Sequence, residues 1–390
     1  YVVFKTYLHR DGMTKTFILA PDSFKESMTA EQACQAMEKG IRQSMPDANC
    51  IHLPMADGGE GTVDALIAAL GGVRIECEVT GPLSHQKIHT YFGWVERSRT
   101  AVIEMAKANG IQLLQPHLRN PLNTSTFGTG EMIRAALNLN AEKIIIGLGG
   151  SVTNDAGAGM AQALGVHFLD ENKNEVGLGG GQLNQVKSID LSQLDSRLVQ
   201  TKMIIASDVS NPLCGENGAS AVFGPQKGAS AEMVKILDDN LSYFSDVVES
   251  TLGIHVKHQA GAGAAGGLSF GLMAFTGATI QSGAELIIKE TGLAEKIAQA
   301  DYVFTGEGSI DFQTKFGKTP WAVAQVAKRF NKPVIAFAGR VGEDVDVLYN
   351  DGFNQIISIN PPNTDLSTAL KNAEINLTNT VENVVFSLKK

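Results

Sequence analysis

The two ends of the chain carry the same alternation of a short apolar strand, a polar loop and a helix. This alternation covers residues 16–70 near the amino end and residues 302–386 near the carboxyl end. Strands that alternate with helices predict a parallel sheet with helices packed on its faces. The residues between these two regions follow a different pattern. The sequence therefore predicts one α/β domain built from both chain ends, with a second domain inserted into it.

The middle of the chain begins with strand-like segments that have no long helix between them. These segments are residues 73–79, 88–95 and 100–105, and antiparallel pairing is expected for them. A chain of 390 residues also exceeds the usual size of a single core. We place the first crossing between domains at Gly81-Pro82. The predicted division is a leader outside the fold (1–12), a Rossmann- or flavodoxin-like α/β domain (13–82 plus 292–390) and an inserted mixed α/β domain (83–291).

Composition narrows the class of protein. The net charge of −9 comes without a Lys/Arg cluster, which argues against a nucleic-acid partner. No apolar run reaches 18 residues, so no membrane partner is expected. The four cysteines have no CxxC or metal-ligand spacing and are typical of reduced thiols, which favours a cytoplasmic location. The 41 glycines exceed the usual share of about 7% and cluster in loops, which suggests binding by backbone groups.

Five acidic residues stand just after predicted strands or in the turns that follow them. They are Asp22, Asp57, Asp208, Glu307 and Asp311. Ligands of parallel sheets bind beyond the carboxyl ends of the strands, and carboxylates there can hold Mg²⁺ or accept a hydroxyl proton. A single loop Asp is usually a cap or turn residue, but five share this placement. With lysines available to neutralise an anion, the set indicates phosphoryl transfer.

Other motifs are weaker. Gly261, Gly263 and Gly266 form a GxGxxG, but a poor strand precedes it; a close-packed helix start or an anion site competes with a dinucleotide site. Gly317-Lys318-Thr319 is similar to the end of a P-loop, but Phe312 stands where the first glycine is required. No histidine pair has metal-ligand spacing.

Eight motifs, in order along the chain, together resemble the bacterial glycerate kinase family. They are APDSFKES (20–27), ADGGEGT (56–62), GLGGSVTNDAG (147–157), DVSNPLCG (208–215), FGPQKGA (223–229), GAGAAGGL (261–268), TGEGSIDFQT (305–314) and GKTP (317–320). The resemblance extends from Met13 to the carboxyl end. One departure is Gln259-Ala260, where proline often precedes the glycine-rich motif.

The resemblance implies ATP-dependent phosphorylation of D-glycerate with Mg²⁺. The product expected for this branch, the glycerate 2-kinase type of class I, is 2-phosphoglycerate, formed in a cleft between two α/β domains. The expected partners are these small molecules and a further copy of the chain in a homo-oligomer. Three alternatives stay open: glycerate 3-kinase regiochemistry, a non-catalytic glycerate or nucleotide sensor, and a nicotinamide dehydrogenase.

The site hypothesis assigns three catalytic residues and two metal ligands. Asp208 is the first choice to orient or deprotonate the glycerate hydroxyl, and Lys25 contacts the phosphate or the glycerate carboxylate. Asp57 is the third catalytic candidate and could also help to hold Mg²⁺; Glu307 and Asp311 are the expected Mg²⁺ ligands. The expected substrate and nucleotide contacts are Asp22, Ser23, Gly58, Gly59, Gly149, Gly150, Ser151, Asn154, Asp155, Lys227, Gly261, Gly263, Gly306, Gln313 and Lys318.

Overall fold

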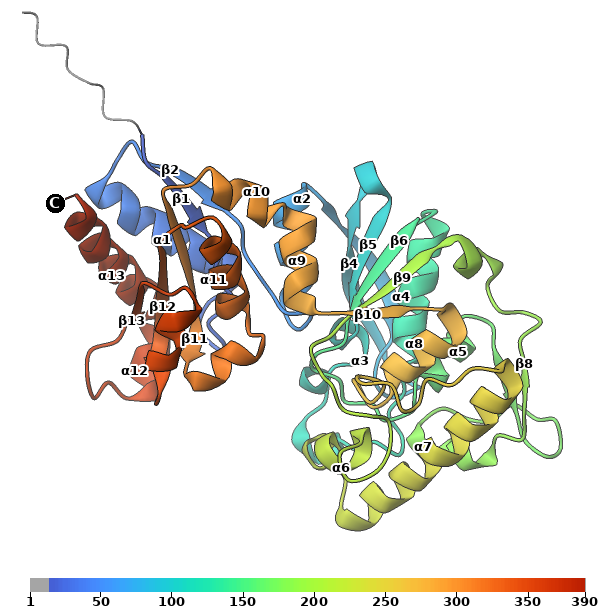
Figure 1. The fold of residues 1–390 in the computed structure, drawn as a ribbon. Coiled ribbons are helices and arrows are strands. Elements are labelled where there is room, and N and C mark those ends of the chain that lie inside the picture. Colours follow the sequence, from blue (N-terminus) through green and yellow to red (C-terminus); the bar gives the residue numbers. More distant parts are fainter. Residues whose placement is uncertain (1–13, 390) are drawn as a thin grey trace, which may run out of the picture. The chain divides into compact units, whose positions relative to one another are not determined.

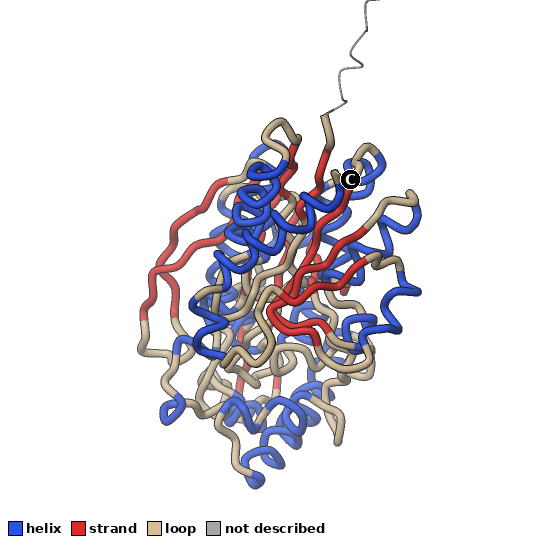
Figure 2. The backbone as a smooth tube through the Cα atoms, turned by 90° about the vertical axis from the view of Figure 1, so that its left-hand side faces the viewer, coloured by secondary structure: helices blue, strands red, loops and turns tan. Residues whose placement is uncertain are grey.

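The computed structural model describes residues 14–389, so the predicted leader (1–12) lies outside the described residues. Contacts within the chain divide it into two units. Unit 1 comprises residues 14–54, 292–316 and 320–389, and unit 2 comprises residues 55–291 with 317–319. Figures 1 and 2 show both units as strands flanked by helices, which confirms the predicted α/β class.

Unit 1 is a five-stranded parallel sheet with helices around it. Its strands are β1 (Thr16–Leu19), β2 (Asn49–His52), β11 (Tyr302–Ile310), β12 (Val334–Val341) and β13 (Gln355–Ser358). Its helices are α1 (Ala30–Ser44), α10 (Leu293–Ala298), α11 (Thr319–Arg329), α12 (Leu366–Lys371) and α13 (Ala373–Leu388). The strand order is β13-β12-β11-β1-β2, with every pair parallel.

Local signals explain how α1 begins and where it packs. Thr29 and Gln32 form a capping box, in which each side chain accepts a hydrogen bond from the backbone of the other. The apolar face of α1 packs against α13, and the two helices lie side by side in Figure 1. A Cβ on Gly40 would stand 2.4 Å from the carbonyl oxygen of Thr378. Glycine at this point therefore allows the close helix contact.

Unit 2 contains a mixed six-stranded sheet and a small two-stranded one. Its strands are β3 (Val73–Thr80), β4 (Lys87–Val95), β5 (Thr100–Glu104), β6 (Lys143–Gly147), β7 (His167–Leu169), β8 (Ser188–Asp190), β9 (Lys202–Ala206) and β10 (Thr279–Gln281). Its helices are α2 (Thr62–Leu70), α3 (Ala106–Asn109), α4 (Phe127–Asn138), α5 (Ala158–Ala163), α6 (Ala219–Phe223), α7 (Ala231–Leu252), α8 (Leu268–Thr276) and α9 (Gly283–Thr291).

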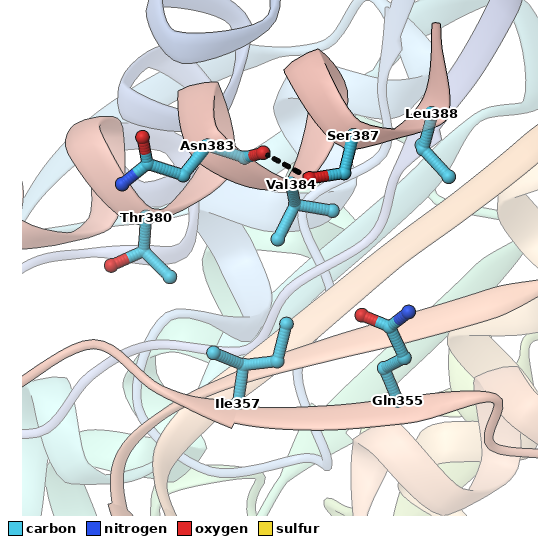
Figure 3. Close-up of a pocket in the computed structure, with 7 residues that line it drawn as sticks. All are labelled: Gln355, Ile357, Thr380, Asn383, Val384, Ser387 and Leu388. Carbon is cyan, nitrogen blue, oxygen red and sulfur yellow. Dashed lines mark hydrogen bonds between the residues drawn. The ribbon is translucent and has the colours of Figure 1, made fainter. Parts of the chain in front are cut away.

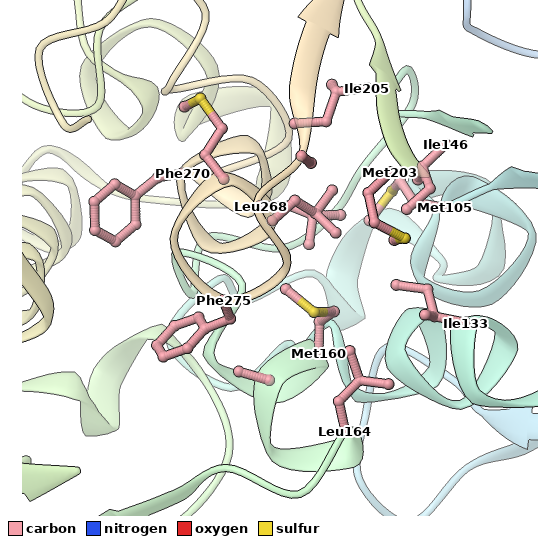
Figure 4. Close-up of a cluster of buried hydrophobic side chains, with 14 of the residues drawn as sticks. Met105, Ile133, Ile146, Met160, Leu164, Met203, Ile205, Leu268, Phe270 and Phe275 are labelled. Carbon is pink, nitrogen blue, oxygen red and sulfur yellow. The ribbon is translucent and has the colours of Figure 1, made fainter. Parts of the chain in front are cut away.

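The larger sheet of unit 2 has the order β10-β9-β6-β5-β4-β3. The four strands from β10 to β5 are parallel, while β4 and β3 join antiparallel, as predicted for residues 73–105. Apolar side chains from β6, β9, α4, α5 and α8 form a continuous buried cluster beside the parallel strands (Figure 4). This core fixes the carboxyl ends of the parallel strands, where the polar loops follow.

The first crossing between units lies at Pro54/Met55, so the predicted boundary at residue 82 is wrong. The reason is hydrogen bonding: β3 pairs along its whole length with β4, which places it in the sheet of unit 2. The second crossing lies at Thr291/Gly292. Val345–Asp351, between β12 and β13, forms a 3₁₀ turn. Within residues 14–389, no helix is both long enough and apolar enough to cross a membrane.

Candidate active site

The sheet of unit 1 reverses its strand order between β1 and β11. Read from β2 to β13, its strands follow the flavodoxin-like order 2-1-3-4-5, in which ligands bind beyond the carboxyl ends at the reversal. The loop after β1 meets β11 at this point. The N–H of Asp22 donates to the carbonyl oxygen of Gly306 at 2.9 Å, and the hydroxyl of Thr305 donates to that of Ala20 at 2.8 Å. Two of the motifs, at 20–27 and 305–314, therefore adjoin.

The loop after β1 forms a closed turn that presents Lys25. Phe24 and Met28 exchange backbone hydrogen bonds, and Glu26 between them has a φ of +63°. Asp22 accepts a hydrogen bond from the N–H of Ser23 at 2.6 Å, so one of its oxygens shapes the loop. The Lys25 side chain is exposed at the tip of the turn. A closed turn of this kind can hold a lysine toward an anion.

Asp311 has a local structural role. Its Oδ1 accepts a hydrogen bond from the N–H of Gln313 at 2.8 Å, at the start of the 3₁₀ turn Phe312–Phe316. Glu307 lies half-buried within β11. Among residues 14–389, no three His, Cys, Asp or Glu side chains are grouped to hold a metal ion. The metal role of Glu307 and Asp311 therefore stays a prediction, without a cluster to support it.

In unit 2, the Asp57–Gly59 loop packs directly on the ends of the parallel strands. A Cβ on Gly58, whose φ is +96°, would stand 2.5 Å from the carbonyl oxygen of Ala206. A Cβ on Gly147 would stand 2.2 Å from that of Gly58, and one on Gly283 would stand 1.8 Å from that of Asp57. Backbone contacts this close exclude side chains. The glycines therefore hold Asp57 against the ends of β6 and β9 and the start of α9.

The close contact predicts that Gly283→Ala displaces the Asp57 loop. Misplacement of a reacting group by about 1 Å can cost about 100-fold in rate, so a fall in kcat of about that size is expected. Steady-state kinetics at saturating substrate, with circular dichroism to establish the fold, would measure it. Gly177→Ala is the matched control, because its new Cβ would meet its nearest neighbour at 3.7 Å. Equal rates for both variants would show that the loop position does not matter.

Asp208 follows β9 and faces the start of α9. Partial burial raises the pKa of its carboxyl, while a hydrogen bond from Ser282 lowers it; the negative charge of Asp57 raises it, and the N–H groups of Gly283 and Ala284 lower it. The residue keeps access to solvent. A carboxylate that burial and a neighbouring charge make more basic is suited to accept a proton.

The loop after β6 adds backbone donors. Gly149 and Gly150 are exposed at its tip, and within residues 14–389 their N–H groups make no hydrogen bond. A Cβ on Gly149 would stand 2.7 Å from the Cα of Gly59, so this tip lies against the Asp57 loop. Ser151 is almost buried and accepts a hydrogen bond from the Nζ of Lys227 at 2.9 Å. The N–H groups of Gly149 and Gly150, together with Ser151 and its lysine partner, form an arrangement that can receive an anionic oxygen.

Asp155 and Asn154 support this loop from inside. The Asp155 carboxylate accepts hydrogen bonds from the backbone and hydroxyl of Thr126 and from the N–H groups of Gly157 and Gly159, and it is fully buried. The amide of Asn154 donates to Ser220 at 2.9 Å, also in the interior. Both side chains brace the loop, and their contact with a ligand stays a prediction.

The glycine-rich stretch at 261–267 is closely packed at the start of α8, which is one of the alternatives that the sequence leaves open. A Cβ on Gly263 would stand 2.2 Å from the carbonyl oxygen of Pro212, and one on Gly266 would stand 1.9 Å from that of Thr153. The N–H of Gly263 donates to Asn211. These glycines let the 207–213 and 153–156 loops approach the start of α8, and the ligand contacts of Gly261 and Gly263 stay a prediction.

Sequence reasoning missed several residues around the site. Ser282 and the start of α9 contact Asp208 because they follow β10, which pairs with β9. Strand β10 has three residues and is too short to show any periodicity. Glu104, at the end of β5, accepts hydrogen bonds from the N–H groups of Gly61 and Val63 at 3.0 Å and so holds the start of α2 behind the Asp57 loop. The position of Glu104 directly after a buried strand is the signal that could have found it.

A groove elsewhere in unit 1 lacks the chemistry of a phosphate or metal site. It has a volume of about 310 Å³ and lies between β13 and α13 (Figure 3). None of its lining residues is ionisable; they are Gln355, Ile357, Thr380, Asn383, Val384, Ser387 and Leu388. Ser387 donates its hydroxyl hydrogen bond back to its own helix, to the carbonyl of Asn383. The groove therefore offers no charge to an anion.

The fold is that of an α/β protein in which polar and glycine-rich loops follow the carboxyl ends of the parallel strands. The comparisons with known proteins are more specific. Residues 17–389 match the glycerate kinase family. Glycerate kinase of Haemophilus influenzae is 50% identical over 368 residues, which cover 94% of this chain and 97% of that protein. Glycerate 2-kinase of Escherichia coli K12 is 47% identical, with coverage of 95% and 97%.

A solved crystal structure gives the same result. It is of a protein from Salmonella typhimurium LT2 named as a candidate glycerate kinase 2, and it superposes with a TM-score of 0.87 at 46% identity. The match covers 96% of this chain and 98% of that one. This chain belongs to the glycerate kinase family, and it is a kinase.

Proposed function

We propose that this protein transfers the terminal phosphate of ATP to D-glycerate, with Mg²⁺, and forms 2-phosphoglycerate. The observation that carries the proposal is the position of Asp208, a carboxylate of raised pKa beside Asp57 and the amide donors at the start of α9. The 2-phosphate is favoured because the Escherichia coli relative, 47% identical, is named glycerate 2-kinase. The proposed cellular location is the cytoplasm.

In the proposed mechanism, Asp208 accepts the proton of the glycerate hydroxyl. The hydroxyl oxygen forms a bond to the terminal phosphorus of ATP, the bond from that phosphorus to the bridging oxygen breaks, and ADP leaves with its electron pair. The N–H groups of Gly149 and Gly150 donate to an anionic oxygen of a substrate, which positions it and offsets its charge. The role expected for Lys25 from the sequence, contact with the phosphate or the glycerate carboxylate, stays a proposal; its side chain is exposed on the closed turn of unit 1.

The donor set of unit 2 fits Mg²⁺. This ion prefers oxygen ligands and is commonly held by one or two carboxylates together with substrate phosphates. Asp57 is an exposed carboxylate, and its negative charge raises the pKa of the nearby Asp208. We therefore propose Asp57 as a ligand of Mg²⁺. When bound, Mg²⁺ supplies positive charge to the phosphate oxygens. Glu307 and Asp311 stay the alternative ligands proposed from the sequence.

Incubation with ATP, Mg²⁺ and D-glycerate, followed by phosphorus NMR, tests the proposal. The expected products are ADP and a phosphate ester at the 2-position of glycerate. L-glycerate under the same conditions is the control for substrate choice. An ester at the 3-position would correct the regiochemistry. Binding of D-glycerate without any ADP formation would contradict the kinase proposal and favour a sensor.

A further inference from the structure

Lys227 carries a buried amine that contacts Ser151 of the Gly149–Ser151 loop. It lies on the 3₁₀ turn Pro225–Lys227 and is only 2% exposed. Its Nζ donates to the hydroxyl oxygen of Ser151 at 2.9 Å and to the carbonyl oxygen of Thr153 at 2.7 Å. Both partners are neutral. Within residues 14–389, Lys227 has no acidic group within the 4.0 Å of an ion pair.

Asp155 and Arg119 are charged residues of the segments that pack near Lys227. Asp155, on the loop that Lys227 contacts, attracts it at longer range, but its carboxylate is already used by Thr126, Gly157 and Gly159. Arg119 packs its backbone against Gly228 and directs its guanidinium to the carbonyls of Leu114 and Ile111. A buried amine in these surroundings lacks a direct counter-ion, which disfavours its charged form.

We propose that Lys227 is the buried counter-charge of an anion site at Gly149-Gly150-Ser151, and that it takes up a proton when a carboxylate or phosphate group binds there. The inference rests on the proposed function, which brings an anionic substrate group to this loop. Lys227 acts through Ser151 rather than by touching the substrate, so it is a positioning residue.

The Ser151 hydroxyl connects the Lys227 amine to the anion that we propose binds at the loop. Its oxygen accepts the hydrogen bond from Lys227, which leaves its own proton to be donated outward to the anion, beside the two glycine N–H groups. Burial lowers the pKa of Lys227 to about 7, and the negative charge of Asp155 partly offsets this lowering. An anion within about 4–6 Å typically shifts such a pKa by about 1–3 units toward the charged form. Binding at a pH above 7 should therefore draw a proton from solvent.

Calorimetric titration of the full-length protein at about pH 8 tests this proposal, since free Lys227 is then mostly neutral. D-glycerate and Mg²⁺·ATP are titrated separately, each in phosphate-free buffers of different ionisation enthalpy. The dependence of the heat on the buffer gives the number of protons taken up. We expect about 0.5–1 proton for one of the two ligands. The ligand that shows it identifies the group at the loop as carboxylate or phosphate.

Lys227→Met should abolish the proton uptake and weaken binding of that same ligand by about tenfold or more. Lys143→Met is the matched control, because Lys143 is paired with Glu290 at 2.8 Å, at the amino end of β6. Ser151→Ala retains the lysine and should reduce the uptake, which keeps the test open if Lys227→Met does not fold. A merely structural lysine would affect binding without linked protons.

Two results would overturn the inference. One is an active wild-type kinase that takes up no proton with either ligand, which leaves the proposed function intact. The other is uptake that persists in Lys227→Met. A wild-type protein that binds neither ligand and forms no ADP would contradict the proposed function and the inference together.

Discussion

Replacement of Asp208 by Asn is expected to lower kcat by about 10²–10⁴, the usual contribution of a general base. Asn keeps the size of the side chain but cannot accept the hydroxyl proton. The carboxyl is raised in pKa by partial burial and by Asp57, and is held by Ser282 and the first N–H groups of α9. Removal of its charge also relieves the repulsion from Asp57, so the fold should be retained. Single-turnover and steady-state rates would separate the chemical step from binding.

Asp239→Asn is the matched control for this prediction. Asp239 is an exposed aspartate on α7 in the same unit, so its replacement removes the same charge outside the site. Its kcat should stay close to that of the unchanged protein. A rate for Asp208→Asn within a few fold of this control, with D-glycerate and ATP saturating, would exclude Asp208 as the base.

The sequence predicts those parts of the fold that depend on local pattern. Strands β6 and β9 are short buried runs; Ser207 and Asp208 follow β9, and the glycine pair Gly149-Gly150 follows β6 after Leu148, so both the strands and the loops after them could be located. The carboxyl-end rule then brings Asp208 and Gly149 to one edge of the same sheet without knowledge of any distance. Asp57 is expected from the sequence in the other domain, within residues 13–82, whereas the structure packs its loop on the ends of β6 and β9 in unit 2.

Sheet membership could not be predicted in this way. Helix α2 and strand β3 have ordinary patterns that would suit either unit, and only the pairing of β3 with β4 decides the matter. The glycine-rich stretch at 261–267 shows a related limit. An absent side chain allows the backbone to approach a ligand or another loop equally well, and here it approaches Pro212 and Thr153.

The burial of Lys227 is the least predictable feature of the site. Its surroundings in sequence, FGPQKGA, have the composition of a surface turn. The lysine is enclosed because Gly228, with a φ of +95°, packs against the backbone of Arg119, which comes from a distant part of the chain. No local pattern encodes that contact. Its consequence is a buried amine whose protonation depends on pH near neutrality.

Replacement of Lys227 by Met should change how the stability of unit 2 depends on pH. In the folded protein, burial lowers the pKa of Lys227 from 10.5 to about 7. Between these two values the unfolded chain binds a proton that the folded chain does not. The free energy of unfolding therefore rises with pH in this window, by about 1.4 kcal/mol per pH unit from this one group. Below about pH 7 both states are protonated, and the full cost of the buried charge is present.

Urea unfolding of both proteins at about pH 7 and about pH 9 measures this effect. The stability of the wild type relative to Lys227→Met should increase by about 2–3 kcal/mol between the two values, because methionine does not titrate. Lys143→Met should track the wild type, since Lys143 remains half-exposed and paired with Glu290. Parallel curves for the wild type and Lys227→Met would mean that Lys227 keeps its charge in the interior. In that case a fixed positive charge, rather than a proton drawn from solvent, would meet the anion.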